Sequence, residues 1–197
     1  MICHKHKCIF IHIPRTAGTS VEQSIRPDWT FSDFHKEKHL LASTAKKLYS
    51  EYWDNYFKFS FVRNPWDRMV SMSKYSGFYG CNIIDGKLSI EQYIKKFAGA
   101  EVDPRSKSYG DDSETIPNAV YLNILNEDVD FVGRFENLQE DYNTICSIIG
   151  CTNKLLHKEK GARKKKNYAD FYTEATQKIV GEKYTKDIEY FNYKFGE

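Results

Sequence analysis

The sequence has no long apolar run, few cysteines and almost no excess charge, and each shortage excludes a class of protein. No segment approaches the roughly 18 to 20 consecutive apolar residues of a membrane-spanning helix, and the first residues lack the apolar core of a signal peptide. Five cysteines without regular spacing argue against a disulfide framework. We therefore expect a soluble protein of a reducing compartment, the cytoplasm.

The charge balance and the length narrow the possibilities further. Lys and Arg total 29 against 27 Asp and Glu, a formal net charge of +2, so the composition does not indicate a general nucleic-acid binder. The 197 residues, of which 41% are hydrophobic, suit one domain with a substantial core. We expect a single domain over residues 1–197.

Short apolar runs alternate with helical patterns along the chain. Strands are expected at residues 7–13, at 58–62 and from 130 to 132 onward. Helices are expected at about 19–26, 43–52, 66–75, 89–97, 138–149 and 173–191. This alternation predicts an α/β fold, a mainly parallel central sheet flanked by helices. Residues 77–118 form an irregular insertion, and long irregular segments of this kind commonly carry binding specificity.

The segment after the first expected strand, residues 14–20 (PRTAGTS), has the character of an anion-binding loop. Free N–H groups of a first helical turn and the helix dipole favour a phosphate-like or sulfate-like group there. Thr19 and Glu22 match the S/T-x-x-E capping box, which predicts the helix start. The spacing is not that of the Walker A loop, which counts against an ordinary ATPase or GTPase. The candidate anion ligands are Arg15, Thr16, Ala17, Gly18, Thr19 and Ser20.

A second candidate anion site follows the second expected strand, in residues 63–71 (RNPWDRMVS). Arg63 ends the strand and Ser71 lies two helical turns further on, so together they can hold a second anionic group. Asn64 suits the N-cap and Pro65 the first position of the helix. The two motifs therefore predict two anion sites, each at the end of a strand.

Six cations gather at residues 158–166 and are followed at once by Tyr168, Phe171 and Tyr172. Such runs are usually solvated or bind polyanions in general. A basic loop next to stacking aromatic rings can also clamp a nucleotide.

Histidine and cysteine spacing predicts no metal site. His35 and His39 are four residues apart, but HKEKH is not the HExxH zinc pattern. The cluster at residues 3–8 (CHKHKC) lacks a distal ligand pair at a suitable spacing.

Four segments, in this order, resemble the sulfotransferase family that includes the carbohydrate sulfotransferases: residues 9–20 (IFIHIPRTAGTS), 57–71 (FKFSFVRNPWDRMVS), 130–142 (DFVGRFENLQEDY) and 167–172 (NYADFY). These enzymes use 3′-phosphoadenosine 5′-phosphosulfate, PAPS. The resemblance implies that residues 15–20 form a P-loop-like loop for the 5′-phosphosulfate. It assigns the 3′-phosphate to Arg63 with Ser71, and the loop that closes over the nucleotide to Lys165 and Tyr168.

The resemblance also implies a mechanism. His39 stands where related enzymes carry their catalytic base, with His35 as the fallback, and Arg15 replaces the lysine usual in the family at the reacting group. The implied reaction is in-line transfer of the sulfuryl group from PAPS to a hydroxyl acceptor, with a carbohydrate as the leading candidate and no metal required. The alternatives are a P-loop-like nucleotide kinase and a non-catalytic nucleotide- or glycan-binding module.

Overall fold

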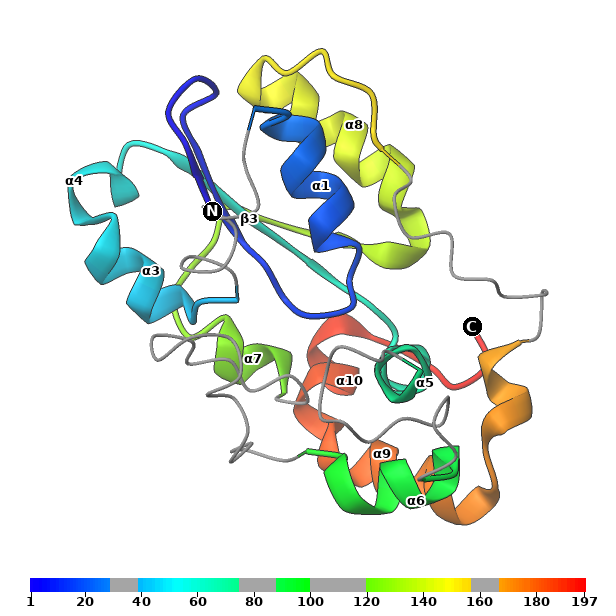
Figure 1. The fold of residues 1–197 in the computed structure, drawn as a ribbon. Helices are drawn as coiled ribbons and strands as arrows, with labels where there is room; N and C mark the ends of the chain where they lie inside the picture. Colours follow the sequence, from blue (N-terminus) through cyan, green and yellow to red (C-terminus); the bar gives the residue numbers. More distant parts are fainter. Residues whose placement is uncertain (29–38, 75–87, 100–119, 157–166) are drawn as a thin grey trace.

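The computed structural model describes residues 1–28, 39–74, 88–99, 120–156 and 167–197, and Figure 1 shows their arrangement. A four-stranded sheet has the order β1-β2-β3-β4. Its strands are β1 (Ile2–Cys3), β2 (Cys8–Ile11), β3 (Phe57–Val62) and β4 (Phe131–Arg134). The pairs β2–β3 and β3–β4 are parallel, and β1 is antiparallel to β2. The predicted α/β class with a mainly parallel sheet is confirmed, while β1 was not predicted.

Helices cover both faces of the sheet, which explains why β2 (CIFI) is continuously apolar and why the polar Ser60 of β3 is buried. One face packs against α1 (Gly18–Ile25) and α8 (Leu138–Ile149), with Phe10, Phe59 and Phe61 in that layer of the core. The opposite layer contains Ile9, Ile11 and Val62. Its helices are α3 (Ala42–Leu48), α4 (Ser50–Trp53), α7 (Tyr121–Ile124) and α10 (Thr185–Phe191).

A third apolar cluster lies around α5 (Pro65–Ser73). It joins α5 to α6 (Ile90–Phe97), to the 3-10 helix η3 (Tyr168–Phe171) and to α9 (Glu174–Lys183). Helix α6 is the helix predicted within the insertion; residues 77–87 and 100–118 of that insertion lie outside the described part of the chain. The cluster fixes the helix that carries Ser71, and therefore one side of the candidate site.

Local capping chemistry confirms several predicted helix ends. The Asn64 side chain accepts from the Trp66 N–H at 3.2 Å, with Pro65 as the first helical residue. Ser89 forms a complete capping box with Gln92 at the start of α6. Gly150 ends α8 with a φ of 64°, the left-handed conformation expected of a C-terminal glycine.

Two predicted helices are each split in two. The expected helix at 173–191 is interrupted at Tyr184, between α9 and α10. Just after the break, the Thr185 hydroxyl donates to the carbonyls of Gly181 at 2.8 Å and Glu182 at 3.0 Å. Such a bond back to the preceding turn bends a helix. The expected helix at 43–52 is likewise divided at Tyr49 into α3 and α4.

A buried carboxylate joins the last helix to α7. Asp187 accepts the N–H groups of Tyr121 at 2.6 Å and Leu122 at 3.1 Å. The Tyr121 hydroxyl in turn donates to the carbonyl of Arg63 at 2.6 Å. Burial raises the pKa of Asp187 to about 6, although the two N–H groups lower it. Asp187, whose protonation changes within the folded protein, therefore holds the tyrosine that binds the Arg63 carbonyl.

We predict that this carboxylate makes stability depend on pH. The pKa of Asp187 in the folded state lies above the reference value of 3.8, so the folded protein binds this proton more tightly than the unfolded chain does. The stability gained from the protonated Asp187 is therefore lost as pH rises from about 4 to about 6. The full contribution is about 3 kcal/mol. Urea unfolding of wild type and Asp187→Asn at several pH values measures it. The free energy of unfolding of wild type relative to the variant should decrease across this window; parallel profiles would contradict the prediction.

Candidate functional site

The two predicted anion motifs meet at one edge of the sheet. Strands β2 and β3 are parallel neighbours, so the segments after their carboxyl ends lie side by side, where open α/β sheets bind ligands. The loop after β2 closes on itself, because the buried Thr16 hydroxyl donates to the Ile13 carbonyl at 2.9 Å. Thr16 thus shapes the loop through its hydroxyl.

Left-handed backbone conformations turn this loop into α1. Arg15 has a φ of 67° and Ala17 a φ of 68°, values that cost a non-glycine residue roughly 1 kcal/mol or more. The Ala17 carbonyl accepts the N–H groups of Ser20 at 2.9 Å and Val21 at 3.2 Å. Within the described residues, the N–H groups of Ala17 and Gly18 have no acceptor. The start of α1 therefore presents backbone donors, as an anion site requires.

Gly18 is required by a close contact with a histidine ring. A Cβ atom at this position would lie 2.0 Å from Cδ2 and 2.1 Å from Nε2 of His12. Side-chain atoms do not approach so closely, so the loop and the ring can take these positions only because residue 18 is glycine. The sequence analysis selected Gly18 as a candidate anion ligand and did not predict its contact with His12.

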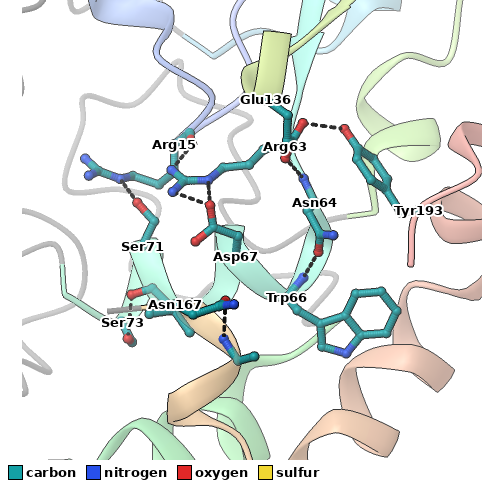
Figure 2. A network of polar contacts seen from close by, with 12 residues as sticks. Arg15, Arg63, Asn64, Trp66, Asp67, Ser71, Ser73, Glu136, Asn167 and Tyr193 are labelled. Carbon is teal, nitrogen blue, oxygen red and sulfur yellow. Dashed lines mark hydrogen bonds and ion pairs between the residues drawn. The ribbon is translucent and has the colours of Figure 1, made fainter. Parts of the chain in front are cut away.

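Side chains of the two motifs contact one another directly, as Figure 2 shows. The Arg15 Nε donates to the Ser71 hydroxyl oxygen at 3.2 Å. The Arg63 Nη1 donates to the Arg15 carbonyl at 3.2 Å. The structure thus brings together Arg15, Arg63 and Ser71, although two separate segments supply them.

Arg63 is only 6% exposed and is fixed on several sides. Its Nε and Nη2 lie 2.7 and 2.6 Å from Oδ2 of Asp67, one helical turn further on. Its guanidinium also stacks over the ring of Phe135, 3.9 Å from the centroid. These contacts hold one cation at the end of β3, with its orientation set before any ligand binds.

A second buried arginine, Arg68, binds the backbone of the loop that follows β2. Arg68 is 2% exposed; its Nε donates to the Pro14 carbonyl at 3.1 Å, and its guanidinium lies 4.6 Å from the centroid of the Tyr121 ring. The sequence analysis did not select Arg68 or Asp67. Their position inside the RNPWDRMVS motif was the available signal.

His39 lies beside the first residue after β2. Its Nδ1 is 3.0 Å from the His12 carbonyl oxygen, its ring centroid is 4.2 Å from that of His12, and its exposure is 6%. A carbonyl oxygen only accepts hydrogen bonds, so Nδ1 carries the proton in this contact. In the neutral ring, the lone pair is then on Nε2. This is the tautomer in which Nε2 can act as a base.

Glu22 pairs with His12, which corrects its predicted role. The capping box of Thr19 with Glu22 is wrong: α1 begins at Gly18, with Ala17 at its N-cap and no side-chain cap. Glu22 instead turns into the core, where Oε1 lies 2.8 Å from the His12 Nδ1. The two side chains are 0% and 3% exposed. The sequence analysis missed this pair; the available signal was the polar His12 within the apolar run of residues 7–13.

The segment after the basic run packs against α5. The Tyr168 hydroxyl accepts the Gly196 N–H at 2.7 Å, and its ring meets Phe195 edge to face. Burial raises the pKa of Tyr168. Lys74, at the end of α5, lies over the ring of Phe171, 3.6 Å from its centroid. The predicted residues His35 and Lys165 lie outside the described ranges, as does the basic run.

The described part of the chain has neither a metal-binding cluster nor a membrane-spanning helix. It contains no group of three or more His, Cys, Asp or Glu side chains placed to hold a metal ion. No helix in it is both long enough and apolar enough to cross a bilayer.

The fold is an α/β sheet with candidate anion donors at the carboxyl ends of two adjacent parallel strands. Residues 1–74 match the model of the sulfotransferase family. The match includes both anion motifs and His39, so it confirms the predicted family resemblance for the first two of its four segments. It supports sulfuryl transfer as the general activity. No curated protein and no solved structure matches the chain.

Proposed function

We propose that the protein transfers the sulfuryl group of PAPS to a hydroxyl acceptor. The observation that carries the proposal is the contact between the two motifs: Arg15 donates to Ser71, and Arg63 donates to the Arg15 carbonyl. A site with two adjoining anion motifs suits a nucleotide that carries charge at both its 5′ and 3′ positions. The family match over both motifs supports the same reading.

In this proposal, residues 15–20 act as a P-loop-like cradle. The N–H groups of Ala17 and Gly18, with the positive end of the α1 dipole, bind the 5′-phosphosulfate, and the hydroxyls of Thr19 and Ser20 add donors. Arg63 and Ser71 bind the 3′-phosphate. Lys165 and Tyr168 close over the nucleotide.

The reaction then needs a base and stabilisation of developing charge. His39 Nε2 takes the proton of the acceptor hydroxyl while that oxygen attacks sulfur, and the bond from sulfur to the phosphate oxygen breaks in line. Arg15 and the N–H groups of the loop stabilise the charge that grows on the sulfuryl group and the departing phosphate. The products are a sulfate ester and 3′,5′-adenosine bisphosphate. Positioning and electrostatics supply the catalysis, as in phosphoryl transfer, and no step requires a metal.

We propose that the acceptor is a carbohydrate and that the insertion at residues 77–118 determines the acceptor specificity. Long irregular segments on a rigid sheet commonly carry specificity. A panel of acceptors that compares oligosaccharides with phenols and simple alcohols tests this part separately.

Nucleotide binding tests the proposal first. We expect 3′,5′-adenosine bisphosphate at 100 times its Kd to stabilise the protein by about 2.7 kcal/mol in a thermal-shift experiment. 5′-AMP and ATP with magnesium should shift it far less. A shift with ATP and magnesium alone would indicate a nucleotide kinase instead. If the bisphosphate binds, transfer of labelled sulfate distinguishes an enzyme from a binding module.

Two serines on one helix give a matched control. Ser71→Ala should weaken binding of the bisphosphate about 10-fold and reduce the preference over 5′-AMP, because a hydrogen bond to a charged group is lost. Ser73 donates to the Val70 carbonyl at 2.9 Å and is not assigned to the site. Ser73→Ala should therefore keep the preference. Equal effects of both changes would count against the assigned 3′-phosphate site.

A further inference from the structure

The proposed mechanism does not use the pair of Glu22 and His12, although the His12 ring lies next to Gly18 and His39 of the candidate site. Glu22 is fully buried on α1, and His12 is the first residue after β2. An ionised carboxylate without a partner in a protein interior costs several kcal/mol. The contact of 2.8 Å with the imidazole offsets this cost, and it fixes how the ring of His12 is turned.

The ring of His12 has three neighbours besides Glu22, and two of them belong to the candidate site. The Cδ2–Nε2 edge of His12 faces Gly18, the start of the anion loop. One neighbouring ring is Phe10 of β2, stacked with centroids 5.5 Å apart. The other is His39, with centroids 4.2 Å apart. A rotation of His12 would therefore disturb both the candidate base and the candidate anion loop.

His39 depends on His12 in a second way. The Nδ1–H of His39 donates to the backbone carbonyl of His12, and this bond determines which nitrogen carries the lone pair. The backbone of His39 has a φ of 65°, a conformation that needs support from its surroundings. The tautomer of His39 thus depends on the backbone of His12, and its ring packs against the ring that Glu22 holds.

We propose that Glu22 and His12 are positioning residues for sulfuryl transfer: Glu22 holds the His12 ring, and His12 holds His39 in the tautomer whose Nε2 acts as the base. The inference rests on the proposed function and deepens it. Glu22 acts through His12 and does not touch the substrate. A pair that only stabilised the core would change the stability of the protein without changing the turnover of the folded enzyme.

Two variants of Glu22 separate these roles. Glu22→Ala removes the acceptor of the His12 Nδ1–H, and we expect kcat to fall about 100-fold, the effect of a misplacement of about 1 Å at a reacting group. Glu22→Gln keeps an oxygen that can accept this bond and should restore most of kcat.

The control is Ser24→Ala on the same helix. Ser24 donates to the Ser20 carbonyl at 2.6 Å and accepts the Leu156 N–H at 2.8 Å, so its loss also removes buried hydrogen bonds. Its stability should fall while its kcat stays at the wild-type value when measured below the unfolding transition. A kcat for Glu22→Ala equal to that of Ser24→Ala overturns the proposal. If Glu22→Ala does not fold, Glu22→Asp, which draws the carboxylate back by one methylene, takes its place with the same expectation.

The nitrogen spectrum of the histidine rings gives a readout that does not depend on activity. In ¹⁵N-labelled protein, His39 should carry its proton on Nδ1 in wild type and in Glu22→Gln, and should show a mixture of tautomers in Glu22→Ala or Glu22→Asp. An unchanged His39 tautomer in the Ala or Asp variant overturns the positioning role. Failure of the wild type to bind the bisphosphate would instead overturn the proposed function, so the two failures are distinguishable.

Discussion

A Gly18→Ala variant is expected to bind 3′,5′-adenosine bisphosphate about 100-fold more weakly than wild type, a loss of about 2.7 kcal/mol. The added methyl carbon would lie 2.0 Å from the His12 ring. That ring cannot easily retreat, because Glu22 holds one edge and His39 packs against it. The loop must move instead, and the backbone donors at the start of α1 move with it. Isothermal titration calorimetry measures the loss.

Gly181→Ala is the matched control for this change. Gly181 lies inside α9, and an added Cβ would be 3.6 Å from Cζ2 of Trp66, an ordinary van der Waals distance. Alanine is favoured over glycine in a helix by up to about 1 kcal/mol, so this variant should be as stable as wild type or slightly more stable. It should also bind the bisphosphate normally. Wild-type affinity in Gly18→Ala would show that the loop does not hold the nucleotide.

Those parts of the fold that depend on neighbours in sequence could be predicted. The Asn64 cap and the end of α8 at Gly150 use contacts or conformations within a few residues. Strand β2 is a continuous apolar run because helices cover both of its faces. The break at Tyr184 was missed because the apolar period continues across it while the Thr185 hydroxyl bends the chain.

The candidate site divides in the same way. Arg15, Arg63 and Ser71 stand in recognisable motifs, and the parallel pairing of β2 and β3 explains why the two motifs meet. The side chains that orient them carried no such pattern. Glu22 fitted a capping box by spacing, but the left-handed turn at Ala17 starts the helix earlier and leaves Glu22 to face the core. Only tertiary packing reveals such a pairing, because its members belong to different elements.

The second large effect is expected at the candidate base. His39→Asn should lower kcat for sulfuryl transfer by about 1,000-fold, within the range that a general base contributes. Asparagine tolerates the left-handed backbone at this position, where φ is 65°. Its amide N–H can also replace the donor to the His12 carbonyl. The variant therefore removes the Nε2 lone pair with little change to the fold, and binding of the bisphosphate should persist. Single-turnover transfer of labelled sulfate measures the chemical step.

Two further histidines sharpen this test. His4 is exposed, and its Nδ1 lies 2.9 Å from the Tyr56 hydroxyl, so His4→Asn is a matched control that should transfer sulfate at the wild-type rate. His35→Asn tests the fallback assignment of the base. If transfer survives in His39→Asn and is lost in His35→Asn, then His35 is the base and the assignment of His39 is wrong. If His39→Asn alone loses transfer while it still binds the bisphosphate, then His39 is the base. The change would have removed the chemical step without removing nucleotide binding, and the group lost is the Nε2 of the ring whose Nδ1 donates to the His12 carbonyl.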